Sequence, residues 1–235
     1  MITRSKVVKA LSDLVYSGPG FSILRGWAPD PSHVVDNYRR VSVEPIFNSS
    51  TNDNKRKQAT LVYKSNNIKA GPYVPTPPRT DWLNAVLTKI GKESQRTIGG
   101  VVLLRSDPCC RAQMAHCDYI PKPDMLESTD STVPQLLLVA LEDETTMDVW
   151  PGSHRLVRGS TDIQDPVSVV HVSLNKGDAL LFRGDLVHAG SAYTKPNVRV
   201  HFYLDSPLVK RVANRTWIIS KHADPGLADM IREES

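Results

Sequence analysis

The sequence contains little cysteine, with three cysteines among 235 residues. They are Cys109, Cys110 and Cys117. An odd number with two adjacent members does not build a disulfide framework, and there is no C-x-x-C pair to indicate a structural zinc knuckle. This usage fits a reducing compartment, so we expect an intracellular, cytoplasmic protein.

Long apolar runs are missing as well. No stretch reaches the roughly 18 apolar residues of a membrane-spanning helix. The first residues, MITRSKVVKALSDLVYSG, carry charges throughout and lack the continuous apolar segment of a secretion signal. We therefore expect no membrane association. A strong charge of either sign is also absent, since the formal net charge is +4, which permits an anionic substrate without requiring nucleic acid.

One short segment carries a denser positive charge. Lys55-Arg56-Lys57 lies inside Asn48–Gln58, whose polar composition predicts a loop. Short basic runs in polar loops are usually solvated, and this is the interpretation that we favour. A nucleic-acid contact or a nuclear localisation signal is the alternative, so a nuclear location stays open.

Hydrophobic residues make up 40% of the chain, which is enough for a folded core. Apolar residues at helical spacing predict helices over three segments, which are Val7–Val15, Trp82–Ile90 and Leu227–Ile231. For the second of these helices we expect Thr80 as the N-cap and Gly91 as the stop.

From residue 98 onward, short apolar runs separated by turn residues predict strands. The predicted strands are Ile98–Leu104, Arg111–Tyr119, Val133–Leu141, Val167–Leu174, Asp178–Arg183, Leu186–Gly190 and Val198–Leu204. This number of short strands indicates a mainly β sandwich or jelly-roll barrel with flanking helices. We expect a single domain over 1–235, with a helical and loop part at 1–97 covering the barrel, the barrel core at 98–205, and an extension with a short helix at 206–235.

Two residues near the end of a predicted strand have the types and the spacing of metal ligands. Side chains alternate along a strand, so His116 and Asp118 share one face while Cys117 points to the other. His188, in a later predicted strand, supplies a third candidate ligand. Two histidines and one carboxylate form the facial triad of non-haem Fe(II) oxygenases, which leaves positions open for a cosubstrate and O₂.

Arg199 follows His188 at the start of the last predicted strand. We expect the intervening hairpin to return Arg199 beside His188, inside the barrel. A buried guanidinium is costly unless it pairs with an anion, and its fork suits a carboxylate bound through two hydrogen bonds. The C5 carboxylate of 2-oxoglutarate is the candidate that fits.

Longer motifs around these residues resemble a known family. The segments PQLLLVALEDETTMDVWPGSHR and NKGDALLFRGDLVHAGSAYTKPNVRVHFYL resemble the central and closing strands of the phytanoyl-CoA dioxygenase family, within the Fe(II)/2-oxoglutarate-dependent oxygenases. The resemblance covers residues 98–205 and implies a double-stranded β-helix, which is a jelly-roll or cupin-like barrel. It also implies Fe(II) at His116, Asp118 and His188, 2-oxoglutarate at Arg199, and O₂-dependent hydroxylation of a small organic substrate with release of succinate and CO₂.

Two further interpretations stay open. The chain could be an oxygenase that acts on a protein or a nucleic acid, or a β-helix that binds a ligand without turnover. A nucleic-acid substrate is disfavoured, because AlkB-type demethylases usually carry a second arginine where this chain has Asp205. His154, in a Pro-Gly-Ser-His turn, is interpreted as structural. His201 and Tyr203 share the strand face of Arg199 and are candidates for the pocket wall.

Overall fold

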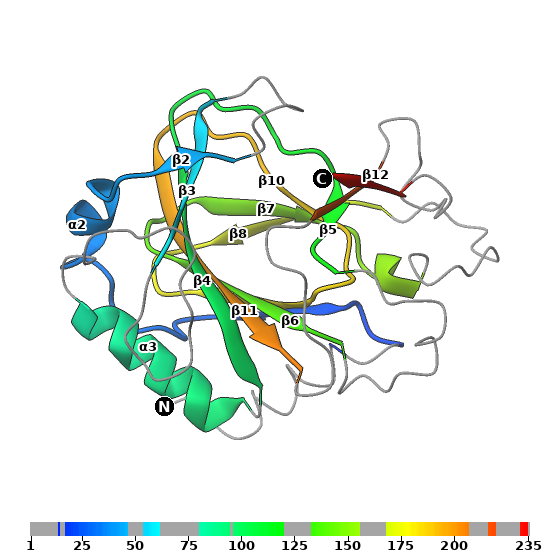
Figure 1. The fold of residues 1–235 in the computed structure, drawn as a ribbon, viewed down its shortest axis with the longest axis horizontal. Helices are drawn as coiled ribbons and strands as arrows, with labels where there is room; N and C mark the ends of the chain where they lie inside the picture. The colour runs from blue at the N-terminus through cyan, green and yellow to red at the C-terminus, as the bar shows by residue number, and fades with distance from the viewer. Residues whose placement is uncertain are drawn as a thin grey trace.

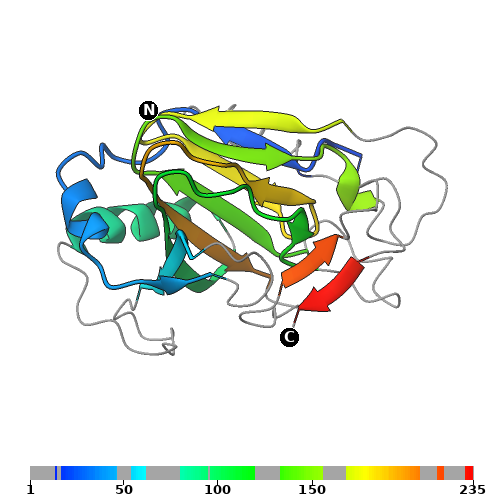
Figure 2. The ribbon, with the colours of Figure 1, turned by 90° about the horizontal axis from the view of Figure 1, so that it is seen from above.

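The computed structural model of the chain describes residues 14, 17–46, 54–61, 80–94, 96–119, 133–155, 168–206, 216–219 and 231–234. These residues form two antiparallel sheets, one of seven strands and one of six (Figure 1, Figure 2). Side chains from both sheets meet in a shared hydrophobic core, so the sheets pack face to face. This arrangement confirms the predicted fold class, a mainly β jelly-roll barrel of the double-stranded β-helix type.

The seven-stranded sheet runs in the order β1-β9-β6-β11-β4-β3-β2. Its strands are β1 (Phe21–Leu24), β2 (Glu44–Pro45), β3 (Arg56–Thr60), β4 (Thr97–Ser106), β6 (Gln135–Ala140), β9 (Ala179–Arg183) and β11 (Asn197–Asp205). β11 pairs with β4 on one side and with β6 on the other, which places it at the centre of the sheet. The limits of the barrel core at residues 98 and 205 stay a prediction, although β1 and β3 join the same sheet.

The six-stranded sheet runs in the order β13-β12-β5-β10-β7-β8. Its strands are β5 (His116–Cys117), β7 (Thr145–Val149), β8 (Val170–Leu174), β10 (His188–Gly190), β12 (Thr216–Ile219) and β13 (Ile231–Glu234). β5 and β10 are neighbours. β12 pairs with the other side of β5, so β5 lies inside the sheet although it is short.

The α-helices of the described residues are α2 (Val35–Arg39) and α3 (Thr80–Glu93). α3 lies against the outer face of the seven-stranded sheet (Figure 1), where its buried side chains form a core with residues of β4, β6 and β11. Neither helix is long and apolar enough to cross a membrane.

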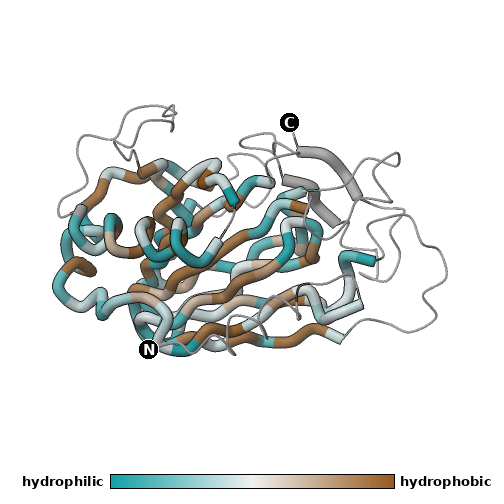
Figure 3. Tube along the Cα trace, turned by 90° about the horizontal axis from the view of Figure 1, so that it is seen from below, coloured by the Kyte–Doolittle hydropathy of each residue, from teal (hydrophilic) through white to brown (hydrophobic). Residues whose placement is uncertain are grey.

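Both faces of β6 are buried, which accounts for its continuous apolar sequence. Leu137 and Val139 point toward the core beneath α3. Leu136 and Leu138 point into the space between the two sheets. Figure 3 shows apolar residues concentrated along the central strands, so this strand connects the two hydrophobic cores of the described chain.

The loop predicted over Asn48–Gln58 is wrong for its last part, because strand β3 begins at Arg56 and pairs with β4. Arg56 is only 2% exposed, so the solvated interpretation of Lys55-Arg56-Lys57 is wrong for its central residue. Lys57 forms an ion pair with Asp107. The polar composition misleads here because the Arg56 guanidinium donates hydrogen bonds to backbone carbonyls inside the protein.

Other predicted boundaries also differ. The strand expected over Arg111–Tyr119 is limited to β5. α3 continues past Gly91, since a glycine within a helix costs only about 1 kcal/mol. Ile231 begins strand β13 and does not end a helix. The rest of that predicted helix, and the Val7–Val15 helix apart from Leu14, lie outside the described residues.

The core position of β6 gives a stability prediction. Leu138→Ala removes a side chain that is 1% exposed between the sheets, and it should lower the free energy of unfolding by about 2–5 kcal/mol. Val170→Ala is the control, because Val170 is 40% exposed on the edge strand β8 and should change it by less than about 0.5 kcal/mol. Urea denaturation followed by circular dichroism measures both. Equal effects of the two substitutions would contradict the assignment of the core.

Candidate metal centre

Three side chains with metal-ligand atoms converge between the sheets. His188 lies directly opposite His116 in the pairing of β10 with β5, and Asp118 follows shortly after β5. The Asp118 carboxylate lies 4.0 Å from His116 Nε2 and 3.9 Å from His188 Nε2. All three ligand atoms are within 4.8 Å of one another, and all three residues are buried. One ion can therefore contact all of them.

Both histidine rings are oriented by a backbone carbonyl two residues earlier in the chain, just before the strand that each histidine begins. His116 Nδ1 lies 2.7 Å from the carbonyl oxygen of Met114, and His188 Nδ1 lies 2.9 Å from that of Leu186. A carbonyl only accepts, so each Nδ1 carries the proton and each Nε2 keeps its lone pair. Such a hydrogen bond fixes the tautomer and the ring orientation of a metal-binding histidine. Both Nε2 atoms face Asp118 and are ready to ligate.

The electrostatics favour a neutral ligand at His188. Burial, with the neighbouring His116 as the second cause, lowers the pKa of His188 to about 3. The ring is therefore neutral at ordinary pH, as a metal ligand must be.

Cys117 takes no part in this group. Its Sγ lies 3.5 Å from the carbonyl oxygen of Asp185, on the other side of β5, as the alternation of strand side chains predicts. Burial raises the pKa of the Cys117 thiol well above its usual value, so the thiolate form that binds metals is disfavoured.

The donor set fits Fe(II). Two imidazole nitrogens and one carboxylate on one side of an ion leave further coordination positions for a cosubstrate and O₂. A structural zinc site would use four protein ligands. Within the described residues, His116, Asp118 and His188 form the one group of at least three metal-ligand side chains close enough to share an ion.

Arg199 lies inside the barrel, but the hairpin expected to bring it beside His188 is wrong. β10 and β11 belong to different sheets, so Arg199 pairs with Leu104 and Ala140. The chain crosses from one sheet to the other between these strands. Val198 belongs to the core beneath α3, and side chains alternate along a strand. Arg199 consequently points into the barrel from the sheet opposite the histidines.

Arg199 is 3% exposed, and its guanidinium has neutral partners. Nη1 donates to Ser106 Oγ at 3.1 Å and lies 3.4 Å from Asn197 Oδ1. The guanidinium carbon lies 5.3 Å from the centre of the Tyr193 ring. No carboxylate in the described chain forms an ion pair with it. A buried cation without an anionic partner is costly, so this position suits an anionic ligand.

The residues around Arg199 carry no sequence pattern that marks them as part of a site. Ser106 and Asn197 lie opposite each other in the pairing of β4 with β11, and both are buried. Neither belongs to a motif that we recognised. Finding them requires the register in which β4 pairs with β11. These two strands lie far apart in the sequence, so local patterns do not give that register.

An aromatic row connects the histidines with β11. The Phe182 ring lies 4.9 Å from the His188 ring and 5.8 Å from the His201 ring. His201 stacks on Tyr203 at 4.7 Å. His201 and Tyr203 thus share the inward face with Arg199, as their spacing predicts. Their part in a substrate pocket stays a prediction.

His154 lies outside the candidate metal group. It is fully buried in a short 3-10 helix, Ser153–Arg155. The Ser153 hydroxyl accepts a hydrogen bond from the Val187 amide, next to His188. The turn therefore supports the strand that carries His188, which agrees with the structural interpretation of this motif.

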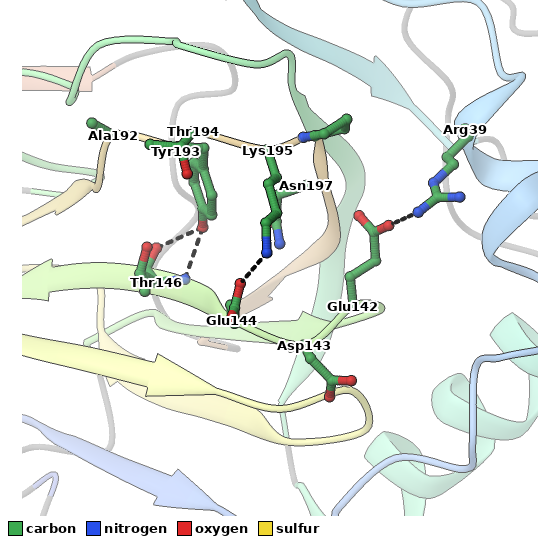
Figure 4. Close-up of a pocket in the computed structure, with 11 residues that line it drawn as sticks. Arg39, Glu142, Asp143, Glu144, Thr146, Ala192, Tyr193, Thr194, Lys195 and Asn197 are labelled. Carbon is green, nitrogen blue, oxygen red and sulfur yellow. Dashed lines mark hydrogen bonds and ion pairs between the residues drawn. The ribbon is translucent and has the colours of Figure 1, made fainter.

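A cleft of about 430 Å³ lies between the connection of β6 to β7 and that of β10 to β11 (Figure 4). Two ion pairs lie in it, Arg39–Glu142 and Lys195–Glu144. None of the three candidate metal ligands lines this cleft. Tyr193 and Asn197 line it and also contact Arg199, so the cleft and Arg199 share two neighbouring residues.

Double-stranded β-helices in which an H-x-D pair and a later histidine meet are characteristic of the Fe(II)/2-oxoglutarate-dependent oxygenases, and the chain is an enzyme of this class. Within the class, it belongs to the phytanoyl-CoA dioxygenase (PhyH) family, whose sequence profile matches residues 42–200. No curated protein sequence matches the chain.

Solved structures share the fold at low sequence identity. The 2-oxoglutarate-dependent epimerase SnoN from nogalamycin biosynthesis is 15% identical, with a TM-score of 0.60, 99% of this chain covered and 95% of that chain covered. HygX from Streptomyces hygroscopicus, with nickel and 2-oxoglutarate bound, is 14% identical, with a TM-score of 0.55 and coverages of 88% and 89%. The carbocyclase SnoK from nogalamycin biosynthesis is 14% identical, with a TM-score of 0.56 and coverages of 87% and 84%.

The geometry predicts one divalent metal ion per chain. His188→Ala removes one of three ligands and should abolish tight binding of Ni(II) or Fe(II), measured by anaerobic calorimetry and metal analysis. His171→Ala is the control, since His171 lies on the outer strand β8, exposed and paired with Asp148. It should bind metal like the unmodified protein. Full stoichiometry and unchanged affinity in His188→Ala would show that the metal binds elsewhere.

Proposed function

We propose that this protein is an Fe(II)- and 2-oxoglutarate-dependent dioxygenase that hydroxylates a small organic substrate and releases succinate and CO₂. Fe(II) is held by His116, Asp118 and His188, and the far carboxylate of 2-oxoglutarate is bound by Arg199. The observation that carries the proposal is the convergence of three buried metal-ligand side chains in a barrel whose opposite sheet presents a buried arginine. Among the described residues, this arginine has no carboxylate partner.

Fe(II), 2-oxoglutarate and O₂ together supply the oxidising chemistry, and the protein supplies binding and orientation. Arg199 offers two parallel N–H donors that match a carboxylate. Ser106 and Asn197 contact its guanidinium and limit its freedom to turn. The cosubstrate is thereby oriented with one end at Arg199 and the other toward the histidines.

The surroundings of the ligands keep water away from the reacting atoms. The Phe182 ring packs against His188, and Val149, directly opposite His188 in the sheet, is fully buried. Exclusion of water strengthens electrostatic contacts inside a site and limits side reactions. The protein therefore contributes a dry environment in which oxidation is directed to the bound substrate.

A small-molecule substrate is supported by two observations. SnoN and HygX have been crystallised with nogalamycin RO and with hygromycin B, which are small molecules. The basic run Lys55-Arg56-Lys57 offers less exposed charge than its sequence suggests, because Arg56 is buried and Lys57 pairs with Asp107. This weakens the main feature that favoured a nucleic acid, since backbone binding needs an exposed basic surface.

The prediction for the cosubstrate concerns Arg199. Arg199→Ala should weaken 2-oxoglutarate binding to the metal-loaded protein, because loss of one partner of a buried charge pair costs about 2–5 kcal/mol. This corresponds to a dissociation constant raised by about 30-fold or more, measured by anaerobic calorimetry. Arg25→Ala, at a side chain 55% exposed, should leave the constant unchanged. If Arg199→Ala bound 2-oxoglutarate normally, another residue would have to be the anchor.

The substrate class is tested by succinate formation. A panel of small natural products should include compounds that stimulate Fe(II)-dependent conversion of 2-oxoglutarate to succinate, and mixed DNA or RNA should not. Nucleic-acid binding is measured in parallel at two salt concentrations. Submicromolar affinity with a steep salt dependence, joined to nucleic-acid-stimulated succinate release, would overturn the small-molecule assignment. Absence of any Fe(II)-dependent succinate would favour a binding module without turnover.

A further inference from the structure

The Arg56 side chain links the seven-stranded sheet to the chain segments that carry the two histidines. Arg56 lies in β3, opposite Ser106 of β4. Its guanidinium donates hydrogen bonds to three backbone carbonyls, those of Arg111, Gly190 and Ser191. None of these acceptors belongs to the seven-stranded sheet, so the side chain links β3 to the segments that lead into β5 and out of β10.

These acceptors lie on both sides of the histidine pair along the chain. Arg56 Nε donates at 2.7 Å to the carbonyl of Arg111, in the segment that leads into His116. Nη2 donates at 2.9 Å to the carbonyl of Gly190, which ends the strand that begins with His188. One rigid, planar group therefore binds the segment that precedes His116 and the segment that follows His188.

Gln113 joins the same two segments directly. The backbone N–H of Gln113 donates to the Gly190 carbonyl, and the backbone N–H of Gly190 donates to Gln113 Oε1 in the side chain. Each of these hydrogen bonds is 2.9 Å long. A Cβ at position 190 would lie 2.5 Å from Gln113 Oε1 and 2.7 Å from Arg56 Nη1. A side chain at this position would therefore displace the polar ends of Gln113 and Arg56. We call Arg56, Gln113 and Gly190 the backbone clamp.

The pairing of the two strands alone fixes the distance between the histidines only weakly. The pairing of β5 with β10 consists of the single register pair His188 and His116, so few backbone hydrogen bonds fix their separation. The clamp adds hydrogen bonds immediately beyond this pair. Those from the guanidinium are charge-assisted, and such bonds are roughly twice as strong as neutral ones. A change in the clamp should therefore alter the relative position of the two rings.

We propose that Arg56 is a positioning residue that sets the spacing of His116 and His188 and thereby the affinity and geometry of the metal site. The proposal rests on the function proposed above. Arg56 is not one of the three candidate ligands, and it acts through the backbone that carries them. Groups that orient metal ligands from outside typically contribute about 10–100-fold to metal affinity.

The test uses the full chain and Co(II), whose visible absorption reports ligand geometry. Arg56→Gln should fold, as judged by circular dichroism and cooperative melting. It should bind Co(II) at least about tenfold more weakly than the unmodified protein, with a shifted absorption spectrum. Lys57→Gln is the matched control, because Lys57 neighbours Arg56 in β3 but pairs with Asp107. It should bind Co(II) within about twofold of the unmodified protein.

The spectrum separates positioning from simple stabilisation. A merely structural Arg56 would lower the melting temperature in Arg56→Gln but leave Co(II) affinity and spectrum of the folded protein unchanged, and that result overturns the proposal. If Arg56→Gln does not fold, Arg56→Lys keeps the buried charge but loses the planar fork. It should still weaken Co(II) binding by about threefold or more with a shifted spectrum, and an unchanged affinity and spectrum would equally refute the proposal.

Failure of the metal site itself has a different signature. If the unmodified protein bound no Co(II), or if His188→Ala bound it equally well, the metal centre would be wrongly assigned and the proposed function would fail first. If the unmodified protein binds Co(II) and His188→Ala does not, the assignment of the metal centre is supported. The Arg56 variants then test the clamp alone.

Discussion

Polar groups placed between the two sheets must be satisfied away from bulk water, and this constraint governs the arrangement around the candidate metal. A buried donor or acceptor left without a partner costs about 1–3 kcal/mol. Nδ1 of each histidine is satisfied by the carbonyl two residues earlier in the chain, and the Arg56 guanidinium donates to three carbonyls. The inner nitrogens and the Asp118 carboxylate are left facing one another, which is where a cation fits.

Much of this arrangement follows from short-range rules. Alternation along a strand is enough to put His116 and Asp118 on one face with Cys117 behind them, and the structure agrees. The apolar run of β6 predicts burial on both faces. β7 was not among the predicted strands. Its residues alternate between buried and partly exposed positions, so a stricter search for alternation would have found it.

The remaining features depend on contacts between distant parts of the chain. β3 is polar in composition and becomes a strand because β4 pairs with it and because the barrel interior accepts Arg56. The crossing between β10 and β11 places His188 and Arg199 in opposite sheets, which spacing alone does not specify. Ser106 and Asn197 become neighbours through the register of β4 and β11. Local pattern carries no information about such pairings.

The position of β5 has a consequence for the order of assembly during synthesis. β5 is bordered by β10 on one side and by β12 on the other, and both follow it in the chain. Until both neighbours have been synthesised, β5 has unpaired backbone groups on at least one of its edges. Unpaired strand edges can pair with other chains. Pairing between distant segments also slows folding. β12 must therefore be synthesised before the strand that begins at His116 is paired on both sides.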